Sequence, residues 1–167
     1  MTMNRPLLFC TFRLDERLFG IDVHDVQEVL CPAVITPVPL AADAVSGLFS
    51  LRGQIMAAID LRRCFGFPGR LPDSPMVALI VNTQDGPVSL LADQIHEVLE
   101  PDPADFEGVP AGGEDLVSQR LTGVFKLPDG LLRVLDVSAI MASVMAHGRE
   151  NIANDKWTKT DQDSAGR

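Results

Sequence analysis

The sequence has no long uninterrupted apolar stretch and few cysteines. None of its apolar runs approaches the about 20 residues that span a bilayer, and the start, residues 1–5, leads directly into alternating apolar and polar residues. We therefore expect neither membrane insertion nor secretion. The three cysteines, Cys10, Cys31 and Cys64, are an odd number without C-x-x-C spacing. This favours reduced thiols in the cytoplasm over a disulfide framework or a zinc site.

Basic residues are also scarce. The chain has 14 Lys and Arg against 23 Asp and Glu, and residues 149–167 hold four of each sign, so the net charge of -9 belongs entirely to residues 1–148. Such a surface repels phosphate backbones, and we expect no binding to nucleic acid. The one basic cluster has no interleaved aromatic residues and is opposed by an acidic stretch at 100–115; it consists of Arg52, Arg62, Arg63 and Arg70.

Motifs of catalysis are missing as well. The sequence contains no G-x-G-x-x-G, Walker loop, G-x-S-x-G or H-E-x-x-H. Asp60 and Asp136 each precede an amphipathic segment, which favours helix capping over paired acid–base chemistry. We therefore expect no enzyme, no cofactor and no metal. Two rival hypotheses stay open: a small-ligand-binding pair of β-barrels, and a hydrolase that uses His96 or Cys64.

An internal repeat is the strongest positive feature of the sequence. Residues 19–30 overlay residues 88–99 at a shift of 69, and residues 45–65 overlay residues 121–141 at a shift of 76. The seven additional residues fall in the acidic connection at 100–120, which is rich in proline and glycine and is predicted to be a surface loop. The chain is therefore predicted to contain two similar units, at about 7–66 and 75–148.

Each unit has the pattern of short antiparallel strands that end in a helix. Turn residues separate the alternating segments at Asp15-Glu16, Gln84-Asp85 and Pro128-Asp129, and helices are predicted after both aspartates that precede amphipathic segments. The second helix is predicted to end at His147-Gly148, and the polar residues 149–167 to form a disordered tail. We expect a mostly β fold of two similar small barrels, and a single sandwich with tandem halves is the alternative.

With these segments assembled, the chain resembles the CheW family of chemotaxis coupling proteins over nearly everything from Leu7 to Ala146. The resemblance rests on segments that follow the family pattern in order and at its usual spacing. They are Gly20-Ile21-Asp22-Val23, Val26-Gln27-Glu28-Val29, Val45-Ser46-Gly47-Leu48, residues 50–55 and 59–62, Leu121-Thr122-Gly123-Val124, and residues 131–136.

The resemblance implies one domain over residues 1–148, made of two intertwined, five-stranded, SH3-like barrels with short helices and a C-terminal helix. It implies a non-catalytic scaffold in the cytoplasm, at membrane-associated receptor arrays. Such a scaffold joins the regulatory domain of a CheA-type histidine kinase to methyl-accepting chemoreceptors. The cytoplasmic receptor tip would bind in a groove between the barrels.

Carried over residue by residue, the resemblance places the receptor contact at five positions and assigns no kinase-binding residues. Arg52 also stands out on its own, since it lies at the tip of an apolar hairpin where the other repeat unit has Pro128. Ser50, Ala58 and Phe19 depart from the usual family residues, so an adaptor of a pilus-motility or other chemosensory array is an alternative. The five predicted receptor-binding residues are Val26, Glu28, Gly47, Arg52 and Val77.

Overall fold

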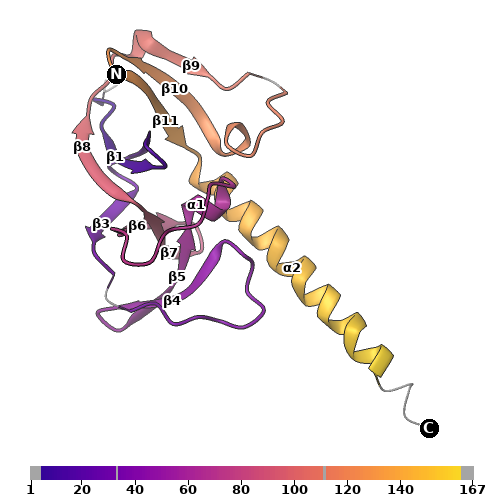
Figure 1. Cartoon of the computed structure of the whole chain (residues 1–167). Helices are drawn as coiled ribbons and strands as arrows, with labels where there is room; N and C mark the ends of the chain where they lie inside the picture. The colour runs from indigo at the N-terminus through magenta and orange to yellow at the C-terminus, as the bar shows by residue number, and fades with distance from the viewer. Residues whose placement is uncertain (1–4, 33, 111, 163–167) are drawn as a thin grey trace.

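A computed structural model of the chain describes residues 5–32, 34–110 and 112–162, with side chains as far as Arg149. Most of the described residues with regular structure lie in β-strands, and one long helix, α2, closes the chain (Figure 1). The elements are β1 (Phe9–Leu14), β2 (Arg17–Asp22), β3 (Val26–Leu30), β4 (Val45–Leu51), β5 (Gln54–Asp60), α1 (Leu61–Cys64), β6 (Val77–Thr83), β7 (Gly86–Ala92), β8 (Gln94–Leu99), the 3-10 turn η1 (Pro103–Asp105), β9 (Phe106–Gly108), the 3-10 turn η2 (Ser118–Arg120), β10 (Leu121–Leu127), β11 (Gly130–Leu135) and α2 (Val137–Gln162).

The strands form two sheets, and each sheet combines strands from both repeat units. The first has the order β8-β1-β2-β11-β10-β9, and the second has the order β3-β6-β7-β5-β4. The hairpin β1–β2 of the first unit therefore joins the second unit's strands, and β6–β7 joins the first unit's strands. In both sheets one parallel pair makes the junction, β2 with β11 and β7 with β5. The prediction of a mostly β fold is confirmed, and the strands of the two repeat units are interleaved between its two sheets.

The strand boundaries reproduce the repeat that the sequence predicts. β4 and β10 span Val45–Leu51 and Leu121–Leu127, which differ by 76 positions at both ends. The connection at 100–120, predicted to be a loop, adds the strand β9 to the first sheet by pairing with β10. That sheet therefore has six strands where five were expected, because the inserted segment covers an edge that would otherwise be open.

Three clusters of buried side chains hold the fold together. The largest draws on strands of both sheets and on both helices, so it lies between the sheets and we call it the inter-barrel core. The two smaller clusters each draw on one sheet only. The inter-barrel core includes Phe12, Phe19, Ile59, Leu79, Leu90 and Ile140; the first sheet's own cluster is Phe9, Phe125, Leu132 and Val134; the second sheet's own cluster is Phe49, Met56, Ala58, Ala78, Ile80 and Leu91.

Local side-chain chemistry sets the ends of the helices. The Asp60 carboxylate accepts a hydrogen bond from the Arg62 backbone N–H at 2.9 Å, and the Asp136 carboxylate accepts one from the Ala139 N–H at 3.0 Å. Both aspartates are therefore N-caps, as predicted.

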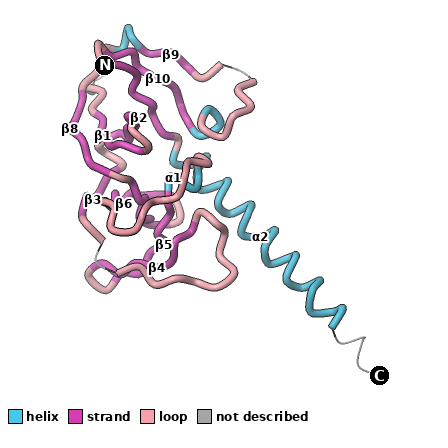
Figure 2. Tube along the Cα trace, viewed as in Figure 1, coloured by secondary structure: helices cyan, strands magenta, loops and turns pink. Residues whose placement is uncertain are grey.

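The predicted end of the second helix at Gly148 is wrong, because α2 continues to Gln162 and extends away from the body of the molecule (Figure 2). A single glycine costs a helix only about 1 kcal/mol relative to alanine, and no proline follows it to stop the helix. The helical residues 149–162 thus differ from the predicted disordered tail, and residues 163–167 lie outside the described residues. No helix in the described part of the chain has the length and apolar character that crossing a membrane requires.

Candidate functional site

Two of the five predicted receptor-binding residues, Arg52 and Glu28, form an ion pair. Arg52 lies at the tip of the β4–β5 hairpin, with a φ of +50° that is followed by +81° at Gly53. Its guanidinium donates from Nη1 to Glu28 Oε2 and from Nη2 to Glu28 Oε1, each at 2.9 Å. This bidentate geometry fixes the plane of the guanidinium. The Arg52 side chain is 72% exposed, so its remaining donors face solvent, whereas Glu28 is 28% exposed.

A β-bulge in β3 explains why Glu28 points toward Arg52. Val26 pairs with Val81 of β6, but Glu28 pairs with the adjacent residue Ile80, so the register shifts between them. Adjacent residues of a strand point to opposite faces, and the bulge therefore sends Val26 and Glu28 to opposite faces of the sheet. Val26 packs against the inter-barrel core, and Glu28 lies on the face of the second sheet's own cluster.

Gly47 is buried and has a structural function in the hairpin. Its φ is +150°, and a Cβ at this position would overlap the carbonyl oxygen of Thr36. Thr36 and Leu48 exchange two backbone hydrogen bonds of 2.8 Å, so the segment before β4 lies directly against the strand. Gly47 therefore permits this close approach of the two backbones.

Val77, the least specific of the predicted contacts, begins β6 and pairs with Ala92. It is half-buried and packs against the inter-barrel core, as Val26 does. The structure thus brings Glu28 and Arg52 together, whereas Val26 and Val77 pack on the opposite face and Gly47 is buried within β4 of the hairpin. Receptor binding by these five residues stays a prediction.

An exposed apolar surface beside Arg52 was not predicted from the sequence. Val34 is 71% exposed, Leu48 is 40% exposed and Ile55 is 68% exposed, and we call these three residues the hairpin patch. Together with Thr36, Phe49 and Ser50 they line an open cavity of about 380 Å³. Both faces of β4 and β5 carry apolar side chains, so alternation in the sequence cannot reveal which of them are exposed.

The outer edges of the two sheets add further apolar side chains. β3 and β8 are the edge strands of their sheets, and they run along the same side of the molecule (Figure 1). Val29 on β3 is 37% exposed, and Ile95 and Val98 on β8 are 38% and 57% exposed. Unpaired strand edges with exposed apolar residues are typical of docking surfaces.

The predicted basic cluster is largely neutralised within the fold. Arg62 donates to both carboxylate oxygens of Asp93 at 2.8 Å, from Nε to Oδ1 and from Nη2 to Oδ2, and Arg70 donates to Asp93 at 3.1 Å and to Asp60 at 3.3 Å. Burial opposes ionisation of Asp93, but the hydrogen bonds from Arg62, the Asp15 N–H and Arg70 outweigh it and lower the pKa of Asp93. Arg62 and Arg70 therefore form their ion pairs with Asp93 and Asp60, and not with the acidic stretch at 100–115.

The structure places the two residues of the hydrolase hypothesis on separate elements, Cys64 in α1 and His96 in β8. Cys64 is 6% exposed, and burial raises the pKa of its thiol to about 11, so the sulfur is protonated at neutral pH. His24 pairs with Asp22 through Nδ1 at 2.6 Å on the surface. His96 lies on the exposed strand β8. Among the described residues, no group of three or more His, Cys, Asp or Glu side chains is placed to hold a metal ion.

Comparisons with known proteins agree on one family. A family-wide sequence model described as "CheW-like domain" matches residues 8–145. The chain is 28% identical to a chemotaxis protein CheW of Klebsiella aerogenes over 145 residues, which is 87% of both chains. It is 30% identical to protein FrzA of Myxococcus xanthus over 117 residues, which is 70% of this chain and 71% of FrzA. The crystal structure of the scaffolding protein TtCheW from Thermoanaerobacter tengcongensis matches with a TM-score of 0.72 and 29% identity, over 80% of this chain and 90% of that one.

Proposed function

The chain belongs to the family of CheW-like domains, and from that premise we propose that it is a non-catalytic adaptor that couples methyl-accepting chemoreceptors to a CheA-type histidine kinase. The observation that carries the proposal is the Arg52–Glu28 pair, which presents a fixed and exposed guanidinium beside apolar side chains. Such a surface suits a protein partner, since apolar contacts provide affinity and the planar donors of arginine fix the register.

The receptor would contribute the cytoplasmic tip of its helical hairpin. A helix that docks on a protein surface needs an apolar face and a polar group that sets its position. In this chain the exposed residues Val29, Ile95 and Val98 supply the apolar surface for such a helix, and Arg52 supplies the polar group that sets its position. Val26, Gly47 and Val77 would support the surface from within, because all three are partly or fully buried.

The kinase would dock on the hairpin patch through its own CheW-like regulatory domain. Val34, Leu48 and Ile55 form an apolar surface that no described part of this chain covers. Exposed apolar side chains with a polar rim are characteristic of the centre of a protein interface. The kinase would then bind on the barrel of the second sheet, and the receptor surface would extend from that barrel onto β8 of the first sheet, in the cytoplasm at receptor arrays.

An adaptor of a different array is the second candidate. The similarity to FrzA of Myxococcus xanthus, at 30% identity, is the observation that favours it. The departures at Phe19, Ser50 and Ala58 lie on strands of the barrels, and Ser50 lies next to the hairpin tip. Both candidates share the adaptor mechanism and differ only in the receptor.

Binding of a receptor-tip fragment tests the assignment of Arg52. We expect Arg52→Ala to weaken binding about 30-fold, which corresponds to about 2 kcal/mol. The matched control is Lys126→Ala, because Lys126 forms an exposed ion pair with Glu107, at 2.5 Å, on the other barrel. Isothermal titration calorimetry measures both. Equal affinity of Arg52→Ala and the parent would show that the assignment is wrong.

Sedimentation velocity with the isolated regulatory domain of the kinase tests the hairpin patch. The kinase domain is added at a concentration about 10-fold above the dissociation constant of the parent complex. Under this condition we expect Ile55→Asp to form no complex, because a buried carboxylate without a partner is costly. Leu131→Asp is the matched control: it is the repeat counterpart of Ile55 and is 41% exposed on the other barrel. If both variants bind as the parent does, the kinase docks elsewhere.

A further inference from the structure

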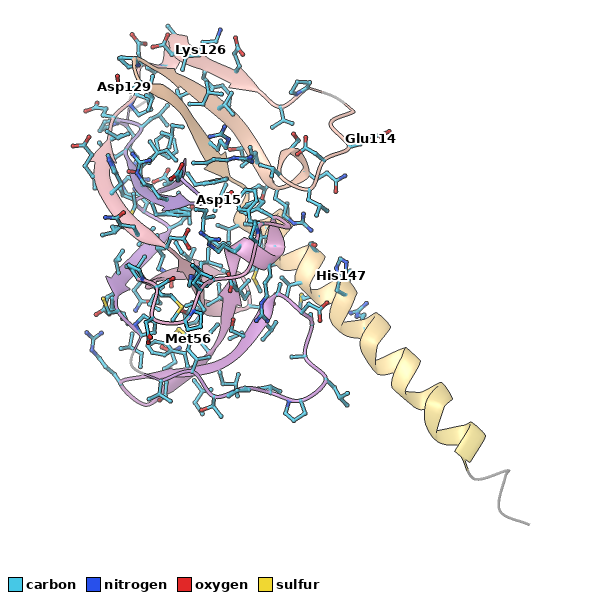
Figure 3. All side chains as sticks on the ribbon, viewed as in Figure 1. Asp15, Met56, Glu114, Lys126, Asp129 and His147 are labelled. Atoms are coloured by element: carbon cyan, nitrogen blue, oxygen red, sulfur yellow. The ribbon has the colours of Figure 1, made fainter. Side chains whose placement is uncertain are left out.

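A cavity of about 200 Å³ lies where α1, η2 and the beginning of α2 meet, away from the hairpin patch and from Arg52. Its lining includes Arg63, Arg120, Ser143 and His147, with the buried thiol of Cys64. Figure 3 shows His147 on α2, close to the point where the helix leaves the body of the molecule. The cavity plays no part in the proposed docking of receptor and kinase.

Arg120 is the unusual residue of this cavity. It is 7% exposed, and its Nη1 donates to the carbonyl oxygen of Leu116 at 2.8 Å and its Nη2 to the Ser143 hydroxyl at 2.6 Å. Within the described residues, no carboxylate lies within 4.0 Å of its guanidinium. A buried charge is normally paired, since removing it from water costs several kcal/mol.

The repeat shows that the fold does not need this charge. The counterpart of Arg120 in the first unit is Ala44, at the same shift of 76. Both residues use their carbonyl oxygens in the same way: the Asp60 backbone N–H donates to the Ala44 carbonyl oxygen at 2.7 Å, and the Asp136 backbone N–H donates to the Arg120 carbonyl oxygen at 2.9 Å. An alanine therefore completes the equivalent junction in the first unit, so this backbone junction does not require the guanidinium of Arg120.

Further donors surround the guanidinium. Arg63 donates from Nη1 to the carbonyl oxygen of Asp43 at 2.9 Å, its Nε lies 4.0 Å from Asp60 Oδ2, and its side chain is 54% exposed at the edge of the cavity. The Ser143 hydroxyl accepts from Arg120, which leaves its own hydrogen to donate. Asp43 contributes the only carboxylate of the described lining, and it is exposed. The cavity thus has two arginines against one aspartate, in a chain of net charge -9.

We propose that this cavity binds a small oxyanion of the phosphate class, with Arg120 as its buried counter-ion and Arg63 and Ser143 as further donors. The charge, the hydroxyl and the arginine geometry are those that recognise phosphate oxygens. The volume is below the range of about 300–1,000 Å³ that is typical of drug-sized ligands, so the site takes an ion with a few waters. Bound anion would link η2 to α1 and α2 and hold the first turns of α2 in place.

Thermal unfolding in inorganic phosphate tests the proposal, with sodium chloride adjusted to constant ionic strength. We expect a rise in Tm with phosphate concentration that follows binding at one site, together with saturable NMR shifts of the amides near Ser143. Arg120→Met, which keeps the length of the side chain, should abolish both effects. Arg63→Gln should weaken phosphate binding at least 5-fold.

Two comparisons make the result decisive. Arg149→Gln removes an exposed charge from the same helix outside the cavity lining, and it should bind phosphate as the parent does. If Arg120→Met does not fold, Arg63→Gln carries the test, because Arg63 is largely exposed. Linear, non-saturating shifts in the parent, or identical responses of Arg63→Gln and the parent, would overturn the proposal.

Discussion

Gly47 and Cys64 act through close packing inside the fold and not through an exposed or reactive side chain. Gly47 is one of the predicted receptor-binding positions, but it is buried against the Thr36 carbonyl and has no side chain to offer. Its influence on a partner would pass through Leu48 and the rest of the hairpin. Cys64 is a second example, since a position that could suggest a reactive thiol is a buried core residue.

Replacing Gly47 tests the structural role of that residue. Gly47→Ala would place a methyl group against a backbone carbonyl at a φ of +150°, so we expect a loss of about 2 kcal/mol or more in the free energy of unfolding. Urea denaturation monitored by circular dichroism measures it. Gly69→Ala, where nothing lies within 4 Å of the new methyl group, should change stability by less than about 0.5 kcal/mol. Equal stabilities of the two variants would contradict this account.

Thiol labelling distinguishes the three cysteines. Cys31 is exposed, whereas Cys10 and Cys64 are buried and burial raises the pKa of both of these thiols. We expect a thiol reagent at pH 7 to modify Cys31 at least about 100-fold faster than Cys10 and Cys64, since only thiolates react. Mass spectrometry after a short pulse identifies the modified residue. In denaturant all three should react at similar rates, and rapid labelling of Cys64 in the folded protein would show that the core is open there.

At the scale of elements, one carboxylate joins segments that are distant in the sequence. Asp93 separates β7 from β8, and it binds Arg62 of α1, Arg70 of the following loop and the backbone N–H of Asp15 in the β1–β2 turn. The side chains of Arg62, Arg70 and Asp93 are 17%, 13% and 21% exposed, so water screens these contacts weakly. This cluster holds the swapped hairpins against α1.

Asp93→Asn should lower the free energy of unfolding by about 3 kcal/mol at pH 7, because two largely buried arginines lose their shared counter-ion. The pKa of Asp93 is lower in the folded than in the unfolded state, so its contribution is present at neutral pH and is lost as the pH falls through the folded pKa. The stability difference between parent and variant should therefore shrink below about pH 4. Denaturation curves from pH 7 to pH 2 measure it.

Asp129→Asn is the control for this experiment. Asp129 is exposed at the tip of the β10–β11 hairpin (Figure 3), and Asp129→Asn should change the free energy of unfolding at pH 7 by less than about 0.5 kcal/mol. If the difference in the free energy of unfolding between the parent and Asp93→Asn is constant down to pH 2, the Asp93 carboxylate is not the source of the stabilisation.

At the scale of the whole molecule, the exchange of hairpins makes the two barrels one cooperative unit. Each sheet needs strands from both repeat units, and the largest core cluster lies between the sheets. The exchange of hairpins therefore excludes a domain boundary between the repeat units, although the sequence repeat alone would place a boundary between residues 66 and 75. The boundary of the domain at residue 148 stays a prediction.

Fragments that correspond to the repeat units test this cooperativity. We expect residues 1–74 and 75–167 each to lack β structure alone, because each would lose the hairpin that completes its sheet. An equimolar mixture should recover the circular dichroism spectrum of the intact chain. A fragment 1–74 that folds cooperatively alone would show that the hairpins are not exchanged in solution.

The repeat, the turns and the two N-caps were predictable from the sequence alone. These features depend on a residue and its neighbours in the chain: Asp60 accepts from Arg62 two positions away, and Arg52-Gly53 turns a hairpin whose strands are adjacent. Such contacts leave a pattern in any window of about ten residues. The length of α2 was the local error, because Gly148 weakens a helix without stopping it.

The choice of strands that share a sheet, and of charges that meet, depends on the folding of the whole chain. Shifts of 69 and 76 positions are the same whether the hairpins are exchanged or not, so the repeat carries no information on the exchange. The pairs Glu28–Arg52 and Arg62–Asp93 join residues 24 and 31 positions apart, and the burial of Arg120 depends on α2 packing over η2. Contacts between distant residues are selected by the packing of the whole chain, and they leave no local pattern.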